Sequence, residues 1–256
     1  TGLIEYTNRV MDTNQALICN SRPRRFGKSI TANMLAAYYS RGCDSKQLFE
    51  GKNISKTKLY EEHLNKHDVI HLDVQWCCMD AGSAEKTVSY ITQKVLCELK
   101  EEFPDVPFSK KNTLGGALAD ITQKTGHKFV IIIDEWDVLI RDEAANLKVQ
   151  EEYIDFLRGL FKGTEPTKFL HLAYLTGILP IKKVRTQSAL NNFEEYTMLT
   201  PANFASYIGF TEEEVKSLCE KYSMDFEKVK HWYDGYLLGN EHVYNPKAVV
   251  SVMMRG

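Results

Sequence analysis

The strongest constraint on the fold lies in residues 21–29, which read Ser-Arg-Pro-Arg-Arg-Phe-Gly-Lys-Ser. They follow an apolar stretch typical of a strand, residues 16–19, and open a stretch with helical spacing, residues 30–39. A loop in this position points main-chain N–H groups from a helix N-terminus toward an anion. Residues 16–39 therefore predict a strand, an anion-binding loop and a helix in succession.

The residue types in this loop suit phosphate binding. Lys28 can reach the β- and γ-phosphates of a nucleotide, Ser29 can ligate Mg²⁺, and Gly27 lets the backbone approach closely. The usual P-loop pattern has glycine where this chain has Arg22, so the triplet also fits an ordinary helix N-terminus with a solvated lysine. The residues that we expect to contact a nucleotide are Arg22, Pro23, Arg24, Arg25, Phe26, Gly27, Lys28, Ser29 and Ile30.

A second motif favours the nucleotide interpretation. An apolar run, residues 129–133, ends in Asp134 and Glu135, which is typical of a buried parallel strand that delivers carboxylates to the carboxyl edge of a sheet. In this Walker B arrangement Asp134 is expected to hold Mg²⁺ through water or Ser29, and Glu135 to orient or deprotonate the attacking water. The alternative is a buried strand followed by an acidic turn that caps the next element. We predict Ser29 and Asp134 as metal ligands, and Glu135 and Lys28 as catalytic residues.

The order of elements predicts an α/β fold. Apolar strand-like runs at 16–19, 69–74, 129–134 and 170–176 alternate with helical segments, notably 83–101 and 147–162. This alternation predicts a P-loop NTPase parallel sheet with helices on both faces. The strand that ends at Asp73 lies between the two motifs in the sequence. By fold-level analogy, such a strand and Glu135 together suggest the P-loop branch that inserts a strand there.

The strand predicted at 170–176 ends in Thr176, and Gly177 follows. Ligands bind at the carboxyl edge of such sheets. We therefore predict Thr176 as a third catalytic residue, in contact with the γ-phosphate or the attacking water. The alternative is a threonine that only caps the following turn.

Composition excludes several other classes. The 256 residues, 43% hydrophobic and 26% charged, suffice for one α/β core and a small additional subdomain. No apolar run approaches the length of a membrane span and no charged-then-apolar leader is seen, so we expect a cytoplasmic protein without membrane contact; a leader removed before Thr1 is the alternative. The net charge of −2 gives no overall basic field for nucleic acid. The six cysteines lack metal-site or disulfide spacing, which suggests reduced thiols.

Three histidines recur every four residues, at His63, His67 and His71. The first two could share a helix face as metal ligands. His71 falls in a predicted strand, however, and the zinc-protease pattern H-E-x-x-H is absent from the sequence. We interpret these side chains as solvated or hydrogen-bonded histidines.

The character of the chain changes after Pro201. Thr211 and Glu214 form a capping box that opens a helix extending to Glu220, and a second helix is predicted from Asp225 to Trp232. The aromatic stretch 232–236 is typical of a packed turn rather than a stacking site. We predict a P-loop ATPase core at 1–200 and a helical, lid-like subdomain at 201–256, truncated before a further C-terminal domain.

Together these segments resemble the bacterial AAA-ATPase-like family, P-loop proteins often fused to a restriction-endonuclease-like domain. The family loop begins with arginine, which accounts for Arg22, and commonly has tyrosine where this chain has Trp136. The resemblance implies an ATP-binding domain, and we expect any nuclease-like domain to lie outside these 256 residues. It is carried by residues 22–29, 133–137, 175–178, 188–193, 209–215, 232–236 and 244–246.

Three functional hypotheses follow. The first is a Mg²⁺-dependent ATPase that acts as a switch or motor for an attached or partner domain, with Arg24 and Arg25 supplying charge near the γ-phosphate or contacting a neighbouring subunit. The second, motivated by Arg22, is a nucleotide-binding adaptor or scaffold module that does not hydrolyse ATP and that could be linked to nucleic-acid processing. The third and least favoured is direct nucleic-acid binding through two basic clusters: Arg22, Arg24, Arg25 and Lys28, and Lys182, Lys183 and Arg185.

Overall fold

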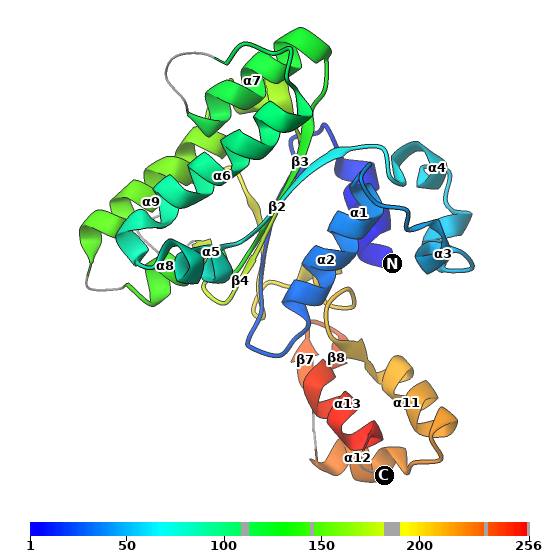
Figure 1. The fold of residues 1–256 in the computed structure, drawn as a ribbon. Helices are drawn as coiled ribbons and strands as arrows, with labels where there is room; N and C mark the ends of the chain where they lie inside the picture. The colour runs from blue at the N-terminus through cyan, green and yellow to red at the C-terminus, as the bar shows by residue number, and fades with distance from the viewer. Residues whose placement is uncertain (109–112, 144–145, 182–189, 233–234, 255–256) are drawn as a thin grey trace.

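A parallel sheet forms the centre of the molecule (Figure 1). The computed structural model describes residues 1–108, 113–143, 146–181, 190–232 and 235–254. All strand pairings in this sheet are parallel, and helices cover the sheet, which confirms the predicted α/β class. In their order across the sheet they are β2 (Asp68–Asp73), β3 (Phe129–Asp134), β4 (Leu170–Gly177), β1 (Leu17–Ser21) and β5 (Glu194–Tyr196).

The burial of β3 explains its continuous apolar sequence. All six of its residues are buried, because β3 lies inside the sheet and helices cover both faces. The strand that lies between β1 and β3 in the sheet is β4. The strand that ends at Asp73, β2, lies between them in the sequence but is an outermost strand of the sheet. The short strand β5 was not predicted.

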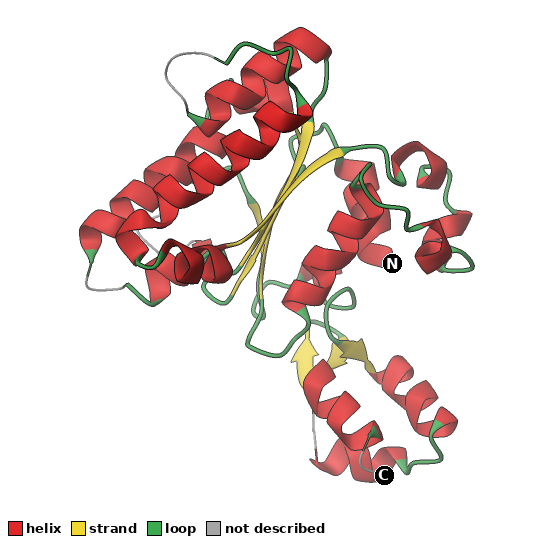
Figure 2. Cartoon of the chain, viewed as in Figure 1, coloured by secondary structure: helices red, strands yellow, loops and turns green. Residues whose placement is uncertain are grey.

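One face of the sheet carries the longer helices (Figure 2). Their apolar sides pack against alternate strand residues such as Ile131, Ile133 and Leu175. The predicted helices 83–101 and 147–162 are confirmed, and a 3₁₀ turn, Ala84–Lys86, precedes the first. The helices on this side are α5 (Val74–Ala81), α6 (Thr87–Glu102), α7 (Leu114–Thr125), α8 (Val138–Arg141), α9 (Leu147–Phe161) and α10 (Pro166–Phe169).

The opposite face is covered by the N-terminal helix and by the helix that follows residues 21–27. We call residues 21–27 with the first turn of that helix the phosphate loop, after their predicted role. Buried polar contacts join these two helices: the hydroxyls of Thr7 and Tyr39 lie 2.6 Å apart, and the Asn8 amide donates to the Tyr38 hydroxyl at 3.0 Å. The elements here are α1 (Gly2–Val10), α2 (Lys28–Tyr39), α3 (Lys46–Phe49), a 3₁₀ turn (Asn53–Lys56) and α4 (Tyr60–His63).

The C-terminal part has its own small apolar core, which includes Val215, Tyr244 and Val249. The predicted capping box of Thr211 and Glu214 is present. This part is not purely helical, because it also holds an antiparallel sheet in the order β6-β8-β7. Its elements are a 3₁₀ turn (Ala202–Phe204), β6 (Phe210–Thr211), α11 (Glu212–Lys221), α12 (Phe226–Trp232), β7 (Tyr236–Leu238), β8 (Glu241–Tyr244) and α13 (Pro246–Met253).

One sequence prediction concerns the aromatic side chains of this region. Trp232 is exposed, so it does not pack in the predicted aromatic turn, and Tyr233 and Asp234 lie outside the described residues. The domain boundary near residue 201 remains a prediction. In the described part of the chain, none of the helices combines the length and apolarity that crossing a bilayer requires.

Candidate functional site

The carboxyl edge of the sheet brings four polar side chains into one row. Asp73 pairs in register with Asp134, Asp134 with Thr176, and Thr176 with Asn20. Their side chains lie on the face covered by α2, because Ile132, two residues before Asp134, packs in the core on that side. The sheet thus brings the predicted Asp134 and Thr176 side by side, and it adds Asn20, which was not predicted.

The phosphate loop turns sharply before α2 begins. Gly27 caps the helix with a φ of +84°, and Arg25 has a φ of +72°. Both values lie in the left-handed region, where glycine is strongly preferred. The loop therefore folds back on itself and presents the first turn of α2 to the row of polar side chains.

Lys28 lies inside this turn. Its side chain is only 5% exposed, and its Nζ donates to the Pro23 carbonyl at 3.2 Å and lies 3.9 Å from Glu135 Oε1. Burial lowers the pKa of Lys28, while the carboxylates of Glu135 and Asp134 act in the opposite direction. The ammonium group is held between the loop and the acidic strand, where a phosphate could replace its present partners.

Asp134 lies at the end of β3 and is almost fully buried. Its Oδ1 accepts a hydrogen bond from the Glu135 N–H at 3.0 Å. Burial raises the pKa of Asp134, and a hydrogen bond with Ser29 lowers it. The two residues predicted as metal ligands therefore lie near each other, Ser29 in the first turn of α2 and Asp134 at the end of β3.

These two oxygen ligands fit Mg²⁺. Mg²⁺ takes few protein ligands and completes its octahedral shell with water and substrate phosphates. Among the described residues, no group of three or more His, Cys, Asp and Glu side chains is placed to hold a metal. A magnesium ion here would accordingly depend on Ser29, Asp134 and the phosphates of a nucleotide.

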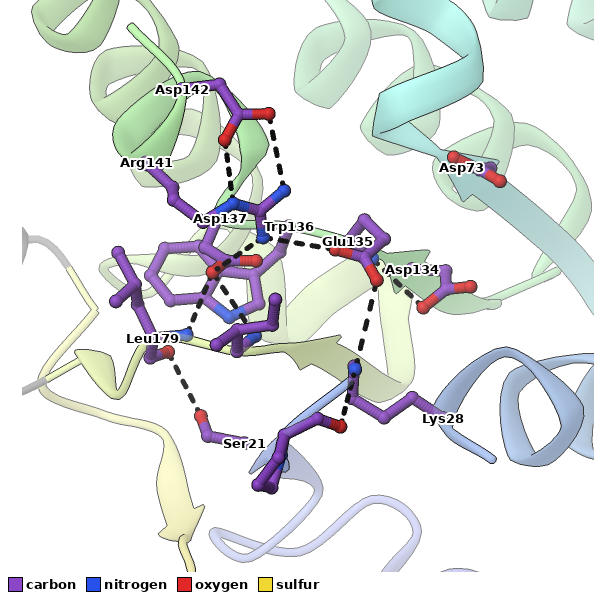
Figure 3. A network of polar contacts seen from close by, with 12 residues as sticks. Ser21, Lys28, Asp73, Asp134, Glu135, Trp136, Asp137, Arg141, Asp142 and Leu179 are labelled. Atoms are coloured by element: carbon purple, nitrogen blue, oxygen red, sulfur yellow. Dashed lines mark hydrogen bonds and ion pairs between the residues drawn. The ribbon is translucent and has the colours of Figure 1, made fainter. Parts of the chain in front are cut away.

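Glu135 lies between two cations (Figure 3). Its Oε1 faces Lys28, and its Oε2 lies 3.2 Å from Arg141 Nη1. The backbone of Glu135 has a φ of +52°, a conformation that costs on the order of 1–3 kcal/mol for a residue other than glycine. This turn carries the carboxylate out of the strand and toward the phosphate loop.

Arg141 and Asp137 extend this arrangement and were not predicted. The Asp137 Oδ2 accepts hydrogen bonds from Arg141 Nη1 at 3.3 Å and from the main-chain N–H groups of Ile178 and Leu179 at 3.2 and 2.8 Å. The Ser21 hydroxyl in turn donates to the Leu179 carbonyl at 3.0 Å. The network therefore connects the acidic motif to the turn after Thr176 and to the start of the phosphate loop. The spacing of Asp137 and Arg141 by four residues is the sequence signal that could have indicated their contact.

The environment of Arg141 favours the charged form of its guanidinium group. Burial lowers the pKa of Arg141, but its hydrogen bonds to Asp142 and Glu135 and the charge of Asp137 outweigh this effect and raise it. Glu135 therefore keeps a permanent cationic neighbour whether or not Lys28 changes partner.

Only glycine fits directly after Thr176. A Cβ at Gly177 would lie 2.5 Å from Asp137 Oδ1 and 2.8 Å from Trp136 Cδ1. Trp136 is fully buried, and its main-chain N–H donates to the Thr176 carbonyl at 3.1 Å. The Thr176 hydroxyl is buried and has no hydrogen-bond partner. This hydroxyl therefore has unused hydrogen-bonding capacity, although Thr176 itself is fully buried.

The remaining loop residues have different environments. Arg22 is buried and donates to the carbonyls of Ser21 and Phe204, at 3.2 and 3.1 Å, and burial lowers its pKa to about 10. Phe26 is buried against the C-terminal part, whereas Arg24 and Arg25 are exposed. The side chain of Arg22 thus anchors the loop. The second basic cluster, Lys182, Lys183 and Arg185, lies outside the described residues, as do Ser188 and Ala189.

A cavity of about 450 Å³ opens directly on the loop. A slightly larger one, about 480 Å³, lies among α6, α7 and α9 and contains no residue of either motif. We assign the site to the first because its chemistry matches the two motifs. Its lining consists of Arg24, Arg25, Gly27, Lys28, Ser29, Ile30, Glu135, Pro246, Lys247 and Val250.

The histidines form a separate cluster at the other end of the sheet. His63 Nδ1 lies 3.0 Å from His67 Nε2, and the ring of His67 packs edge-on against His171. His171 lies 2.7 Å from Asp12. His71, which the sequence pattern grouped with the first two, lies on β2 and does not join them.

Comparison with known proteins agrees with this geometry. A family model described as "Predicted AAA-ATPase" matches residues 4–186. A protein of Azotobacter chroococcum mcd 1, named "Uncharacterized protein in vnfD 5'region", is 24% identical over 234 residues, which are 88% of this chain and 43% of that protein. The chain thus spans less than half the length of this relative. Because the family model covers most of the chain and includes both motifs, the chain belongs to the AAA-ATPase-like family.

Proposed function

We propose that this chain binds Mg²⁺-ATP on the phosphate loop and hydrolyses it. Membership of the family supports ATP binding. The observation that carries the proposal of hydrolysis is the convergence of Lys28, Ser29, Asp134 and Glu135 at one edge of the sheet, next to an open cavity. These side chains supply a cation for phosphate, oxygen ligands for magnesium and a carboxylate for water.

Each residue has a distinct role in the proposed reaction. Lys28 leaves the Pro23 carbonyl and binds the β- and γ-phosphates. Ser29 and Asp134 hold Mg²⁺, which when bound neutralises charge on the phosphate oxygens. Glu135 accepts a proton from a water molecule whose oxygen bonds to the γ-phosphorus. The bond between that phosphorus and the β–γ bridging oxygen breaks, and ADP and phosphate leave.

Two further side chains complete the proposal. Thr176 orients the attacking water or binds the γ-phosphate, because its buried hydroxyl lacks a partner and Asp134 is its neighbour in the sheet. Arg24 and Arg25 are exposed beside the cavity, where either could add charge at the γ-phosphate or contact a neighbouring subunit. The turnover would serve an attached or partner domain as a switch or motor.

The second candidate is an adaptor that binds nucleotide without hydrolysing it. The burial of Arg22 favours this alternative, because the loop is fixed by a side chain where other P-loops have glycine. Nucleic-acid binding is less supported, since Arg22 is buried and Lys28 faces the interior of the loop. We retain the ATPase as the leading proposal because Glu135 faces Lys28, the residue expected to bind the γ-phosphate.

Calorimetric titration of ATP with and without Mg²⁺ tests the proposal. We expect micromolar binding that requires Mg²⁺ and is lost in Lys28→Ala, because the buried ammonium group is the main cation at the site. Lys94→Ala is a suitable control, since Lys94 lies on α6, on the opposite face of the sheet. Unchanged binding in Lys28→Ala would refute the assignment of the phosphate loop.

A further inference from the structure

We propose that the C-terminal part of the chain completes the nucleotide site, and that Ile30 of α2 with Pro246 and Val250 of α13 forms an apolar slot for the purine base. This inference rests on the proposed function. It assigns a role to residues beyond 186, where the family match ends.

The phosphate loop and the C-terminal part are packed together. The ring of Phe26, in the middle of the loop, is buried in a cluster with Ala205, Leu238 and Val243. It also lies 5.4 Å from the ring of Tyr236. Figure 1 shows the C-terminal part beside the end of α2 at which the helix begins. The loop is therefore an element shared by both parts.

The first turn of α13 lies over the loop. The Asn245 side chain caps α13, accepting hydrogen bonds from the N–H groups of Lys247 and Ala248, and its Nδ2 donates to the Arg24 carbonyl at 3.4 Å. A Cβ added at Gly27 would lie 3.9 Å from Pro246 Cγ. Asn245 thus fixes the start of α13 and also its position against the phosphate loop.

The cavity between these elements has two chemically different regions. Lys28, Ser29 and Glu135 line the part next to the sheet, whereas α13 contributes the apolar Pro246 and Val250 together with Lys247. A cavity of about 450 Å³ lies within the range of small-molecule sites. A nucleotide with its phosphates on the loop would therefore direct its other end toward α13.

Two of the three slot residues, Ile30 and Val250, are exposed aliphatic side chains, and Pro246 is half-buried. Ile30 is 72% exposed and Val250 is 42% exposed, although both face the cavity. The faces of a purine ring are apolar, so stacking the base between these side chains would remove apolar surface of protein and ligand from water. Phosphate alone would leave both side chains exposed. The base of a nucleotide is thus the ligand group that matches this part of the cavity.

Comparing ATP with inorganic tripolyphosphate separates the two regions. Both ligands can bind the loop with Mg²⁺, but only ATP carries a base. We expect the parent protein to bind ATP at least about tenfold more tightly than tripolyphosphate. We also expect Ile30→Ser and Val250→Ser each to weaken ATP binding about tenfold, with tripolyphosphate binding unchanged.

Leu237→Ser is the matched control. Leu237 is a 64% exposed aliphatic residue in the same C-terminal part, but it does not line the cavity, so its substitution should leave both affinities unchanged. The altered side chains are exposed, and thermal melting of each variant checks folding. Equal affinities of the parent for both ligands, or unchanged ATP binding in both slot variants, would overturn the base slot. Failure of the parent to bind either ligand would instead reject the proposed function.

Discussion

Charged and polar side chains lie at both ends of the parallel strands, which we call the amino edge and the carboxyl edge. The two edges differ in how many of these side chains have a hydrogen-bond or ion-pair partner. At the amino edge, Asp12 lies 2.8 Å from Lys128 and 2.7 Å from His171. Asp68 lies 2.9 Å from Arg41 on the same side. These acids have basic partners supplied by the chain itself.

The carboxyl edge has polar groups left over. The amide of Asn20 and the hydroxyl of Thr176 are buried, and neither has a hydrogen-bond partner. One carboxylate oxygen of Asp137 is in the same state, whereas the comparable atom at the amino edge, Asp68 Oδ2, lies 3.0 Å from a ring nitrogen of His127. A buried polar group without a partner costs about 1–3 kcal/mol. We infer that the amino edge serves stability, whereas the carboxyl edge keeps unpaired polar groups for a ligand.

The largest effect is expected for the carboxylate that faces both cations. Glu135→Gln should lower the rate of ATP hydrolysis about 100-fold or more and leave ATP binding intact, because the amide cannot accept the proton. Phosphate release measures the rate, and Glu151→Gln on the exposed side of α9 is the control. Equal, negligible rates in the parent and in Glu135→Gln would favour the adaptor over the enzyme.

The close packing around Gly177 at the carboxyl edge can be tested by substitution. Gly177→Ala should lower the free energy of unfolding by about 1–3 kcal/mol, because the new Cβ would overlap Asp137 and Trp136. Gly159→Ala is the matched control, since a Cβ at Gly159 in α9 meets no other atom within 4 Å. It should raise stability by up to about 1 kcal/mol. Urea denaturation provides both values, and a small effect at Gly177 would mean that this edge adapts easily.

A smaller effect is expected at Arg141, which holds Glu135 without lining the cavity. Arg141→Met should lower kcat about tenfold with little change in KM, because the carboxylate loses its fixed position. Arg141→Lys should restore part of the rate. Steady-state kinetics distinguishes these outcomes. A change in KM alone would show that Arg141 acts on nucleotide binding instead.

We expect a histidine at the amino edge to make the free energy of unfolding depend on pH without affecting nucleotide binding. Burial lowers the pKa of His67 to about 4, and the charges of His171 and His63 contribute. His67 therefore binds a proton more readily in the unfolded chain than in the folded one. Its contribution to the free energy of unfolding is complete above pH 6.5 and is lost as the pH falls toward about 4.

His67→Gln should reduce this slope and leave ATP affinity at neutral pH unchanged. Urea midpoints at about pH 5 and about pH 7 measure the slope, and the exposed His242→Gln is the control. Changed ATP affinity in His67→Gln would mean that the two edges of the sheet are not independent.

The sequence predicted those features that depend on neighbouring residues. The phosphate loop and the acidic end of β3 were predicted, because each is a short motif attached to a strand with a clear apolar pattern. The strand β5 was missed, since its three residues, two of them glutamates, carry no periodic signal. The antiparallel sheet of the C-terminal part was missed for a similar reason, because its strands have two to four residues each.

The orientation of individual side chains could not be predicted from the motif. Arg22 and Arg24 are two residues apart in the same loop, yet the first is buried and the second is exposed. The difference depends on Phe204, whose carbonyl accepts a hydrogen bond from Arg22. Two of the partners of Asp137, Ile178 and Leu179, could not be predicted, because they lie more than 40 residues later in the chain. Such contacts follow from the fold and not from local spacing.

The burial of Phe26 gives the phosphate loop a thermodynamic link to the C-terminal part. The residue lies one position before Gly27, and its ring is held by side chains that come after residue 200. A partner that shifts this ring would also alter the loop and hence the affinity for nucleotide. By reciprocity, nucleotide would change the affinity for that partner by the same factor. Phe26 thus couples binding of a partner at the C-terminal part to binding of nucleotide at the phosphate loop.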